Sequence, residues 1–225
     1  MKEEEIIMEL HDLIYSRQSV RKFKDTPVPD EDVLKILDAV RVGPSSENEQ
    51  NWHFIVVRNE EFKRKLGEVI TAGQQKISAE VAVSDEKQAK RFEKFTKLFT
   101  LFALKAPVLV MVYSFSALPA AYREYNIIKR PQEDIDELFL QSPAMMGLGA
   151  ALEHAVLTMM EMGYGTTMMT SQNWAHKDIE KLVEEEIGFQ REGWFLAAMM
   201  PIGVPDGELK SPGRKNMEEI VTFHN

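Results

Sequence analysis

The sequence predicts a layered α+β domain in which helices and strands alternate along 225 residues. Apolar residues recur at helical spacing in several segments, and short runs rich in β-branched and aromatic residues lie between those segments. Neither an internal repeat nor a Gly/Ser-rich linker interrupts the alternation. We therefore expect a single domain over residues 1–225.

Composition narrows the classes of function. The chain holds 27 Lys+Arg and 36 Asp+Glu, and the resulting net charge of −9 argues against binding to nucleic acid. The absence of cysteine excludes disulfides, Cys-ligated metals and thiol nucleophiles, and the five histidines lack metal-ligand spacing. The first ten residues hold four Glu and no long apolar run, so we expect no signal peptide, no membrane partner and a cytoplasmic location.

The N-terminal part predicts two helices. Apolar residues at helical spacing place the first over residues 6–14, and the basic, polar segment 16–23 follows it. A second apolar stripe over 33–40 predicts the next helix, with Asp30 as its N-cap. Gly43-Pro44 ends that helix.

The middle of the chain predicts two buried strands. Residues 52–58 and 106–115 are short apolar runs, and the second is continuous enough to indicate a central strand. A charged helix is expected at 60–70 and a longer amphipathic helix at 84–104. The longer helix has one aromatic stripe, which consists of Phe92, Phe95, Phe99 and Phe102.

The last third predicts an apolar helix and two further strands. Pro131 and Pro143 bracket a short helix, because each disfavours helix in the residue before it. Residues 144–162 are helical in pattern but apolar on nearly every face, so we expect that helix to be buried on all sides, at a helix–helix or dimer contact. Strands are predicted at 164–170 and 194–205, with a helix at about 177–186 between them.

Three polar segments carry candidate chemistry. Arg17, Ser19 and Arg21 share one face if the chain is extended, which makes an anion clamp or a solvated basic patch. Residues 44–52 concentrate hydroxyl and amide groups before a buried strand, which suits recognition of a heteroaromatic edge or an ordinary turn. Arg214 is a second potential phosphate ligand or a solvated charge.

In their order and spacing these motifs resemble the nitroreductase family of FMN-dependent oxidoreductases. The resemblance consists of R-x-S-x-R at 17–21, P-S-S-x-N-x-Q followed by W-x-F at 44–54, Gly-Tyr-Gly-Thr at 163–166 and the basic pair beginning at Arg214. Asn51 stands where the family usually has proline. The resemblance implies a three-layer α/β sandwich with a mixed, mostly antiparallel sheet between helices. It also implies an intertwined homodimer whose C-terminal tail wraps the partner.

The resemblance implies roles for individual positions. Arg17, Ser19 and Arg214 would hold the FMN phosphate, Gln18 would lie along the ribityl chain or flavin edge, and Arg21 would face the N1/O2 side. The partner subunit would contribute Pro44, Ser45 and Ser46 to the same flavin, and Asn48 would lie near the site. The backbone at Thr170 and Ser171 would approach flavin N5. No metal and no catalytic side chain is expected. His53 is expected to be a packed or edge histidine, and His154 is either a core histidine or a group near the flavin or the subunit interface.

The implied reaction is ping-pong transfer of hydride from NAD(P)H through flavin N5 to a nitroaromatic, a quinone or a similar electron-poor acceptor. Three alternatives stay open: a specialised dehalogenase or flavin-consuming enzyme, an FMN storage or sensing protein, and a structural dimer with an empty site. The sequence also leaves open whether the helix with the aromatic stripe is core or covers the flavin.

Overall fold

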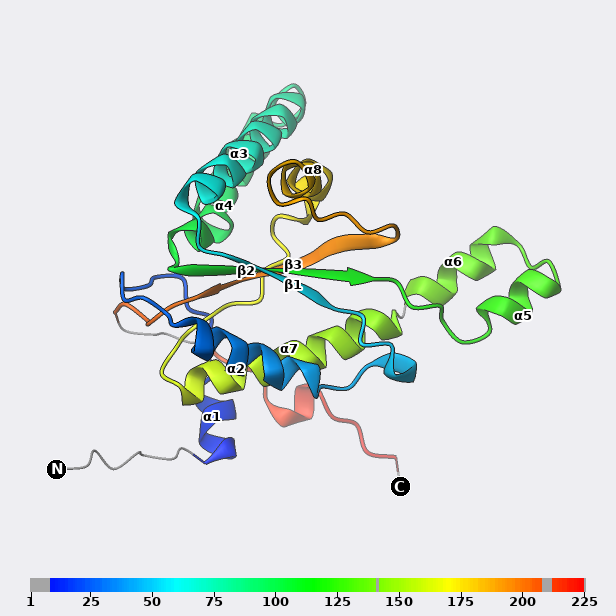
Figure 1. The fold of residues 1–225 in the computed structure, drawn as a ribbon. Coiled ribbons are helices and arrows are strands. Elements are labelled where there is room, and N and C mark those ends of the chain that lie inside the picture. The colour runs from blue at the N-terminus through cyan, green and yellow to red at the C-terminus, as the bar shows by residue number, and fades with distance from the viewer. Residues whose placement is uncertain (1–8, 141, 208–211, 225) are drawn as a thin grey trace.

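A three-stranded antiparallel sheet forms the middle layer of the molecule. The computed structural model describes residues 9–140, 142–207 and 212–224, so the predicted positions 6–8 lie outside the described residues. The strands β1 (His53–Val57), β2 (Val108–Phe115) and β3 (Trp194–Ile202) pair in the order β1-β2-β3. Helices lie above and below them (Figure 1), which confirms the predicted three layers and antiparallel pairing.

One face of the sheet packs on α2 (Asp30–Arg41) and α7 (Pro143–Glu161), and α1 (Leu10–Ser16) contacts α7. Because side chains alternate along a strand, β2 contributes Val108, Val110 and Val112 to this cluster. The same cluster includes the fully buried Ile36 and Val40 of α2. This layer contains the central apolar helix α7.

The other face packs on α3 (Glu60–Ala82) and α8 (His176–Ile187), and α4 (Glu86–Phe99) packs against α3. Leu109, Met111 and Tyr113 of β2 lie in this second cluster, opposite the valines. β2 is therefore buried on both faces, as the continuous apolar run at 106–115 predicts. None of the helices in the described ranges is long and apolar enough to span a bilayer.

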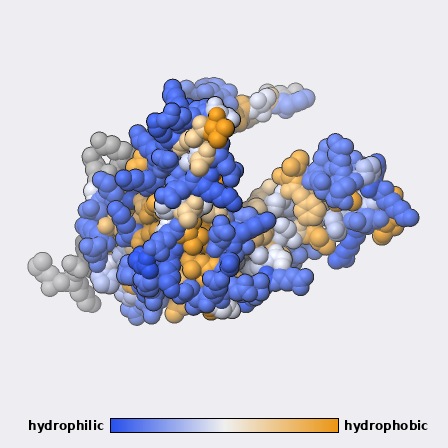
Figure 2. All heavy atoms as spheres, turned by 90° about the horizontal axis from the view of Figure 1, so that it is seen from above, coloured by the Kyte–Doolittle hydropathy of each residue, from blue (hydrophilic) through white to orange (hydrophobic). Residues whose placement is uncertain are grey.

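An arm projects from the end of the sheet. It consists of α5 (Tyr122–Ile127) and α6 (Gln132–Leu140), and Figure 2 shows it standing away from the body with hydrophobic patches on its surface. Ile127 and Ile128 are 79% and 61% exposed. The sequence predicted α6 between Pro131 and Pro143, whereas α5 was not expected. Short 3₁₀ segments complete the chain: Ser46–Asn48, Leu101–Lys105, Asn173–Ala175 and Met217–Glu219.

Two helix boundaries differ from prediction. Asp30 is the first residue of α2, after Pro29, and its carboxylate pairs with Arg58 at 2.7 Å, so it does not cap the helix. The helix expected at 60–70 continues to Ala82, because Ile70, Gln74 and Ser78 extend its buried stripe.

The helix expected over 84–104 is two elements. It breaks at the fully buried Thr100, whose φ of −125° is not helical, and resumes as a 3₁₀ turn. The break lies within the predicted aromatic stripe, so Phe99 and Phe102 belong to different elements. Phe102 packs against the core cluster, whereas Phe99 is 43% exposed.

The strand predicted at 164–170 is wrong. Within the described residues this segment makes only isolated bridges, between Met169 and Met199 of β3 and between Gly165 and Gly203, just after β3. Between those bridges the carbonyl of Thr166 accepts a hydrogen bond from the Val20 amide, so the backbone pairs with a different segment. β3 itself ends at Ile202 rather than at 205.

The apolar helix α7 is buried on one side only within a single chain. Leu148, Leu152 and Val156 face the core, whereas Met146 is 74% exposed and Gly149, Ala150 and His154 are also exposed. The expectations that α7 is buried on all sides and that His154 is a core histidine are therefore wrong for the isolated chain. An exposed apolar helix face of this kind is typical of a contact with another molecule.

Candidate functional site

The segment 17–21 is held against the turn at 163–166. The Val20 amide donates to the Thr166 carbonyl at 2.9 Å, and the Gly165 amide donates to the Gly203 carbonyl at 2.8 Å. A Cβ atom at Gly165 would lie 2.4 Å from Cγ2 of Val20, so only glycine permits this approach. The two predicted motifs therefore form one structure, which we call the cradle: residues 17–21 together with 165–171.

Polar groups in the cradle lack partners. The Oε1 atom of Gln18 is buried and accepts no hydrogen bond within the described residues, and the buried hydroxyl oxygen of Thr166 is also without a partner there. A buried polar atom without a partner costs about 1–3 kcal/mol. A ligand with hydrogen-bonding groups, such as the ribityl hydroxyls of FMN, would satisfy these atoms.

Arg17 and Ser19 are half-buried next to them. The guanidinium Nε of Arg17 lies 3.9 Å from Oε1 of Glu153, longer than a charge-assisted hydrogen bond. Partial burial raises the pKa of Glu153 above its ordinary value, and Arg17 opposes that rise. The described residues thus leave the Arg17 guanidinium able to bind an anion.

Arg21, Thr170 and Ser171 lie near the C-terminal end of α4. The Arg21 guanidinium carbon is 5.5 Å from the centroid of the Phe99 ring. The Ser171 hydroxyl donates to the Phe99 carbonyl at 2.8 Å and accepts from the Thr100 hydroxyl at 3.0 Å. A carbonyl at the C-terminal end of a helix has no donor within the helix, and the Ser171 hydroxyl is the donor for the Phe99 carbonyl. Thr170, beside it, is exposed.

The second polar segment, 44–50, is held against α7. A Cβ atom at Gly147 would lie 3.2 Å from the Pro44 carbonyl oxygen, and the Ser45 hydroxyl accepts from the Gln50 amide at 3.1 Å. Glu47, Asn48 and Gln50 adopt positive φ angles of 49°, 57° and 49°. Such strain in non-glycine residues is concentrated at ligand-binding loops. Pro44 and Asn48 are exposed, and Ser45 and Ser46 are half-buried.

A single chain does not bring all the predicted positions together. The loop 44–48 lies near the N-terminal end of α7, whereas the segment 17–21 lies toward the other end (Figure 1). Arg214 is exposed and donates to the Pro212 carbonyl at 3.0 Å, with no contact to the cradle among the described residues. Arg17, Gln18, Ser19, Arg21, Thr170 and Ser171 therefore form one group, and the other predicted positions lie elsewhere.

A family model described as the nitroreductase family matches residues 14–204. The chain belongs to the nitroreductase family. Among solved structures, a BluB-like flavoprotein from Clostridium difficile 630 is 48% identical, with a TM-score of 0.94 over 97% of this chain and 100% of that chain. An iodotyrosine deiodinase bound to FMN and 3-iodo-L-tyrosine shares the fold at 24% identity and a TM-score of 0.66, over 96% and 100%.

Curated relatives of this nitroreductase-family chain fall into two groups. A protein of Archaeoglobus fulgidus, provisionally named NADH dehydrogenase/NAD(P)H nitroreductase, is 46% identical over 71 residues, which cover 32% of this chain and 41% of that protein. The match therefore spans about two fifths of that relative. An iodotyrosine deiodinase of Thermotoga neapolitana is 25% identical over 220 residues, covering 96% of this chain and 97% of that protein.

Asn51, which departs from the nitroreductase-family pattern, has a structural role that the sequence reasoning missed. Its side chain is 1% exposed and donates to the Ser114 hydroxyl at 2.9 Å and to the Ala144 carbonyl at 3.3 Å. Ser114 in turn donates to the Asn51 carbonyl at 2.6 Å. The loop is thereby tied to β2 and to the start of α7. An amide at a position usually occupied by proline was the signal for this role.

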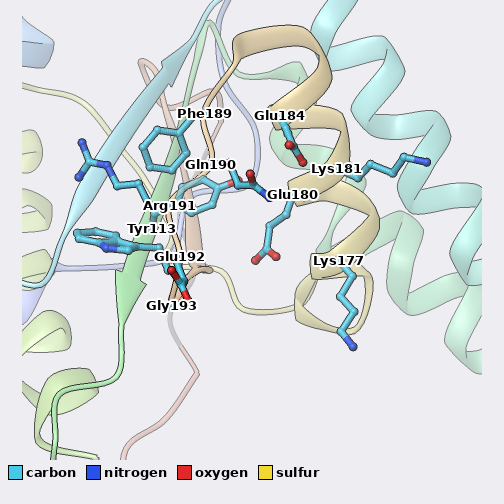
Figure 3. A pocket seen from close by; sticks show the side chains of 11 residues that line it. Tyr113, Lys177, Glu180, Lys181, Glu184, Phe189, Gln190, Arg191, Glu192 and Gly193 are labelled. Carbon is cyan, nitrogen blue, oxygen red and sulfur yellow. The ribbon is translucent and has the colours of Figure 1, made fainter.

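The pocket shown in Figure 3 is separate from the cradle. Its volume is about 480 Å³, and it lies between α8 and the loop 189–193. Glu180 accepts from the Leu196 amide at 2.7 Å, and burial raises the pKa of Tyr113. His53 stacks on Phe189 with ring centroids 4.4 Å apart, so it is packed as expected. None of the predicted cofactor positions lines this pocket.

A second cavity, of about 650 Å³, connects the arm with the loop 44–48. Ser46 and Glu47 line one side of it, and Tyr125, Arg130 and Glu137 line the other. The Arg130 guanidinium carbon is 5.5 Å from the Tyr125 ring centroid. Within the described ranges no group of three or more His, Asp or Glu side chains is arranged to hold a metal ion.

Proposed function

We propose that this nitroreductase-family protein is an FMN-dependent oxidoreductase that transfers hydride from a reduced nicotinamide dinucleotide to an electron-poor acceptor such as a nitroaromatic or a quinone. One observation carries the proposal: a half-buried cradle holds an arginine whose contact to Glu153 is too long for a hydrogen bond, beside buried polar atoms that lack partners among the described residues. The solved deiodinase relative that contains FMN supports the identity of the ligand. When bound, FMN supplies two-electron chemistry that no side chain of this chain offers.

The side chains of the cradle would bind and orient the cofactor. Arg17 and Ser19 supply a charged fork and a hydroxyl for a phosphate, and a hydrogen bond to a charged group is worth about 1.5–3 kcal/mol. Gln18 accepts from the sugar-like chain or the ring edge. Arg21 places a positive charge by the ring system, which stabilises negative charge there. The backbone at Thr170 and Ser171 would contact the ring. The hydrogen bond from the Ser171 side chain to the Phe99 carbonyl holds that backbone in place at the end of α4.

The complete site requires a second copy of the chain in this proposal. The loop 44–48 and Arg214 do not reach the cradle of their own chain, whereas α7 exposes an apolar face around Met146, Gly149 and Ala150. The C-terminal tail also exposes apolar side chains, with Ile220 and Phe223 61% and 84% exposed. A homodimer that buries both surfaces would bring Pro44, Ser45, Ser46, Asn48 and Arg214 to the partner's cradle.

An absorption spectrum of the purified protein tests the proposal. We expect a flavin spectrum that bleaches under NADH or NADPH without oxygen and returns when a nitroaromatic or quinone is added. Flavin that no nicotinamide bleaches would contradict the oxidoreductase assignment and favour storage or sensing. If the protein takes up no FMN, the assignment of FMN as the cofactor is wrong, and a structural dimer with an empty site is the remaining hypothesis.

Reductive dehalogenation is a second candidate. The deiodinase of Thermotoga neapolitana matches nearly the whole chain, arm included, and the cavity by the arm presents charged groups to a polar substrate. Release of iodide from 3-iodo-L-tyrosine by the reduced protein would support this activity. A reduced protein that consumes quinone but releases no iodide would exclude it.

A further inference from the structure

Helix α4 exposes an aromatic face flanked by positive charge. The α4 face consists of Arg91, Lys94, Phe95, Leu98 and Phe99, and its three apolar side chains are 43–48% exposed. The adjoining side of the helix is fixed by packing: Ala89 and Thr96 are buried, and the Phe92 ring centroid lies 5.2 Å from that of Trp174. The α4 face is thus presented outward by a rigid attachment rather than by a loose end.

The α4 face is continuous with the cradle. The rings of Phe95 and Phe99 stack with centroids 5.3 Å apart, and the Arg21 guanidinium lies 5.5 Å from the Phe99 centroid. Ser171 binds the Phe99 carbonyl from the other side. Phe99 therefore lies next to Arg21 of the cradle, and Phe95 continues the aromatic surface away from it.

The charge of α4 opposes that of the whole chain. Its fourteen residues hold five basic and two acidic side chains, a net charge of +3 in a chain of −9. Among the described residues, neither Arg91 nor Lys94 takes part in an ion pair, whereas Lys90 pairs with Glu86. A local positive patch attracts an anionic substrate that the rest of an acidic protein repels.

We propose that the α4 face binds the reduced nicotinamide dinucleotide, with a ring system against Phe95 and Phe99 and the diphosphate against Arg91 and Lys94. The inference rests on the proposed function, because it locates the electron donor of that reaction. Stacking of a base on an aromatic side chain is worth about 1–3 kcal/mol. The helix repeat separates Arg91 and Phe95 by a rotation of about 40° around the helix axis, so both side chains can contact one ligand.

The test measures binding of NAD⁺ and NADP⁺, which do not react, to the FMN-loaded protein by calorimetry. We expect the double variant Arg91→Glu/Lys94→Glu to raise the dissociation constant at least about tenfold. Phe95→Ala should also weaken binding, by about fivefold or more. Added salt should weaken binding to the unaltered protein and affect the double variant less.

A matched control separates a local site from a general charge effect. Lys90→Glu/Lys97→Glu changes the charge of the same helix equally, but these residues lie about 140–160° from Phe95 around the helix. We expect this control to bind both dinucleotides as the unaltered protein does. Equal losses in the two double variants, or no loss in either, would overturn the inference. Absence of binding to the unaltered protein would overturn it too, as expected if another protein surface covers the α4 face.

The two proposals fail in different ways. If NADH bleaches the flavin and the α4 variants bind dinucleotide normally, the proposed function stands and the inference is wrong. If dinucleotide binding depends on Arg91 and Lys94 but the flavin is not reduced, the α4 face stands as a binding site and the proposed function is wrong.

Discussion

Gln18 and Arg17 illustrate what a sequence motif establishes at the scale of the residue. The spacing of R-x-S-x-R predicts an anion clamp. Among the described residues, Arg17 makes only a 3.9 Å contact to Glu153, and the Oε1 atom of Gln18 has no hydrogen-bond partner. The spacing could not show that Arg214 donates to the Pro212 carbonyl rather than binding beside this group, because a motif says nothing about where a segment far along the chain lies. The cofactor-binding roles of these residues remain predictions.

Removal of both proposed phosphate ligands should remove the flavin. We expect Arg17→Ala/Arg214→Ala to purify colourless, because two charge-assisted contacts are lost, with FMN affinity falling at least about a hundredfold. Absorbance of the purified protein and FMN titration measure the effect. Arg123→Ala/Lys177→Ala removes two exposed positive charges elsewhere and should stay yellow. Full flavin content in the first variant would refute the phosphate assignment.

Asn51 should matter for stability rather than for chemistry. Asn51→Ala leaves buried partners on β2 and α7 unsatisfied, so we expect a loss of about 1–3 kcal/mol and a lower melting temperature. Asn126→Ala removes one exposed hydrogen bond to Tyr122 and should change stability by no more than about 0.5 kcal/mol. Equal melting temperatures for the two variants would contradict the role of Asn51.

At the scale of the element, helix and strand positions followed from apolar spacing, and the errors share one cause. The segment 164–170 has the composition of a strand, but Thr166 pairs with Val20 instead of continuing a ladder. The helix at 84–104 has unbroken periodicity, but burial of Thr100 interrupts it. In both places a contact from far along the chain overrides local preference, which periodicity cannot reveal.

Glycine at position 165 should be required for the cradle. Gly165→Ala would put a methyl group 2.4 Å from a Val20 side-chain carbon, so the 17–21 segment must move. We expect weaker FMN binding and a loss of stability of about 1–3 kcal/mol. Gly163 is not a suitable control because its φ is +79°, whereas Gly213→Ala meets no neighbour within 4 Å. Unchanged FMN affinity in Gly165→Ala would contradict the role of this approach.

The contact between α2 and the glycine turn should depend on pH. The Tyr164 hydroxyl donates to Asp32 at 2.5 Å, and this bond raises the pKa of Tyr164 to about 12. Because the folded pKa exceeds the unfolded value near 10, the stabilisation is complete below about pH 10 and is lost as pH rises toward 12. Unfolding of Tyr164→Phe compared with the unaltered protein from pH 8 to about 12 should show a difference that shrinks with pH. A difference in the free energy of unfolding that stays constant from pH 8 to about 12 would contradict the predicted pH dependence.

At the scale of the whole molecule, the fold was predictable from the family resemblance, but the completeness of the site was not. Three layers and an antiparallel sheet are present in one chain, whereas the loop 44–48 and the cradle lie apart. The all-round apolar pattern of α7 has no explanation within a single chain. One domain over residues 1–225 and a dimer both remain predictions.

Disruption of the α7 face should separate the copies and release the cofactor together. Light scattering of the unaltered protein should give twice the 25.8 kDa mass of one chain. Met146→Glu/Ala150→Glu places charge on the exposed face without touching the core and should yield monomers that bind FMN poorly. Lys35→Glu, at an exposed position of α2, serves as the control. Monomers that retain FMN tightly would contradict a shared site.

The position of β1 at the edge of the sheet has a consequence for how the protein is made. β1 pairs with β2 alone among the described strands, so one row of its backbone groups faces outward. A newly synthesised copy carries this open edge together with the bare α7 face, and both favour association. Under the proposed assembly, maturation ends with a step whose rate rises with protein concentration. A low concentration of the chain would prolong the time for which these surfaces are exposed and can aggregate with other proteins.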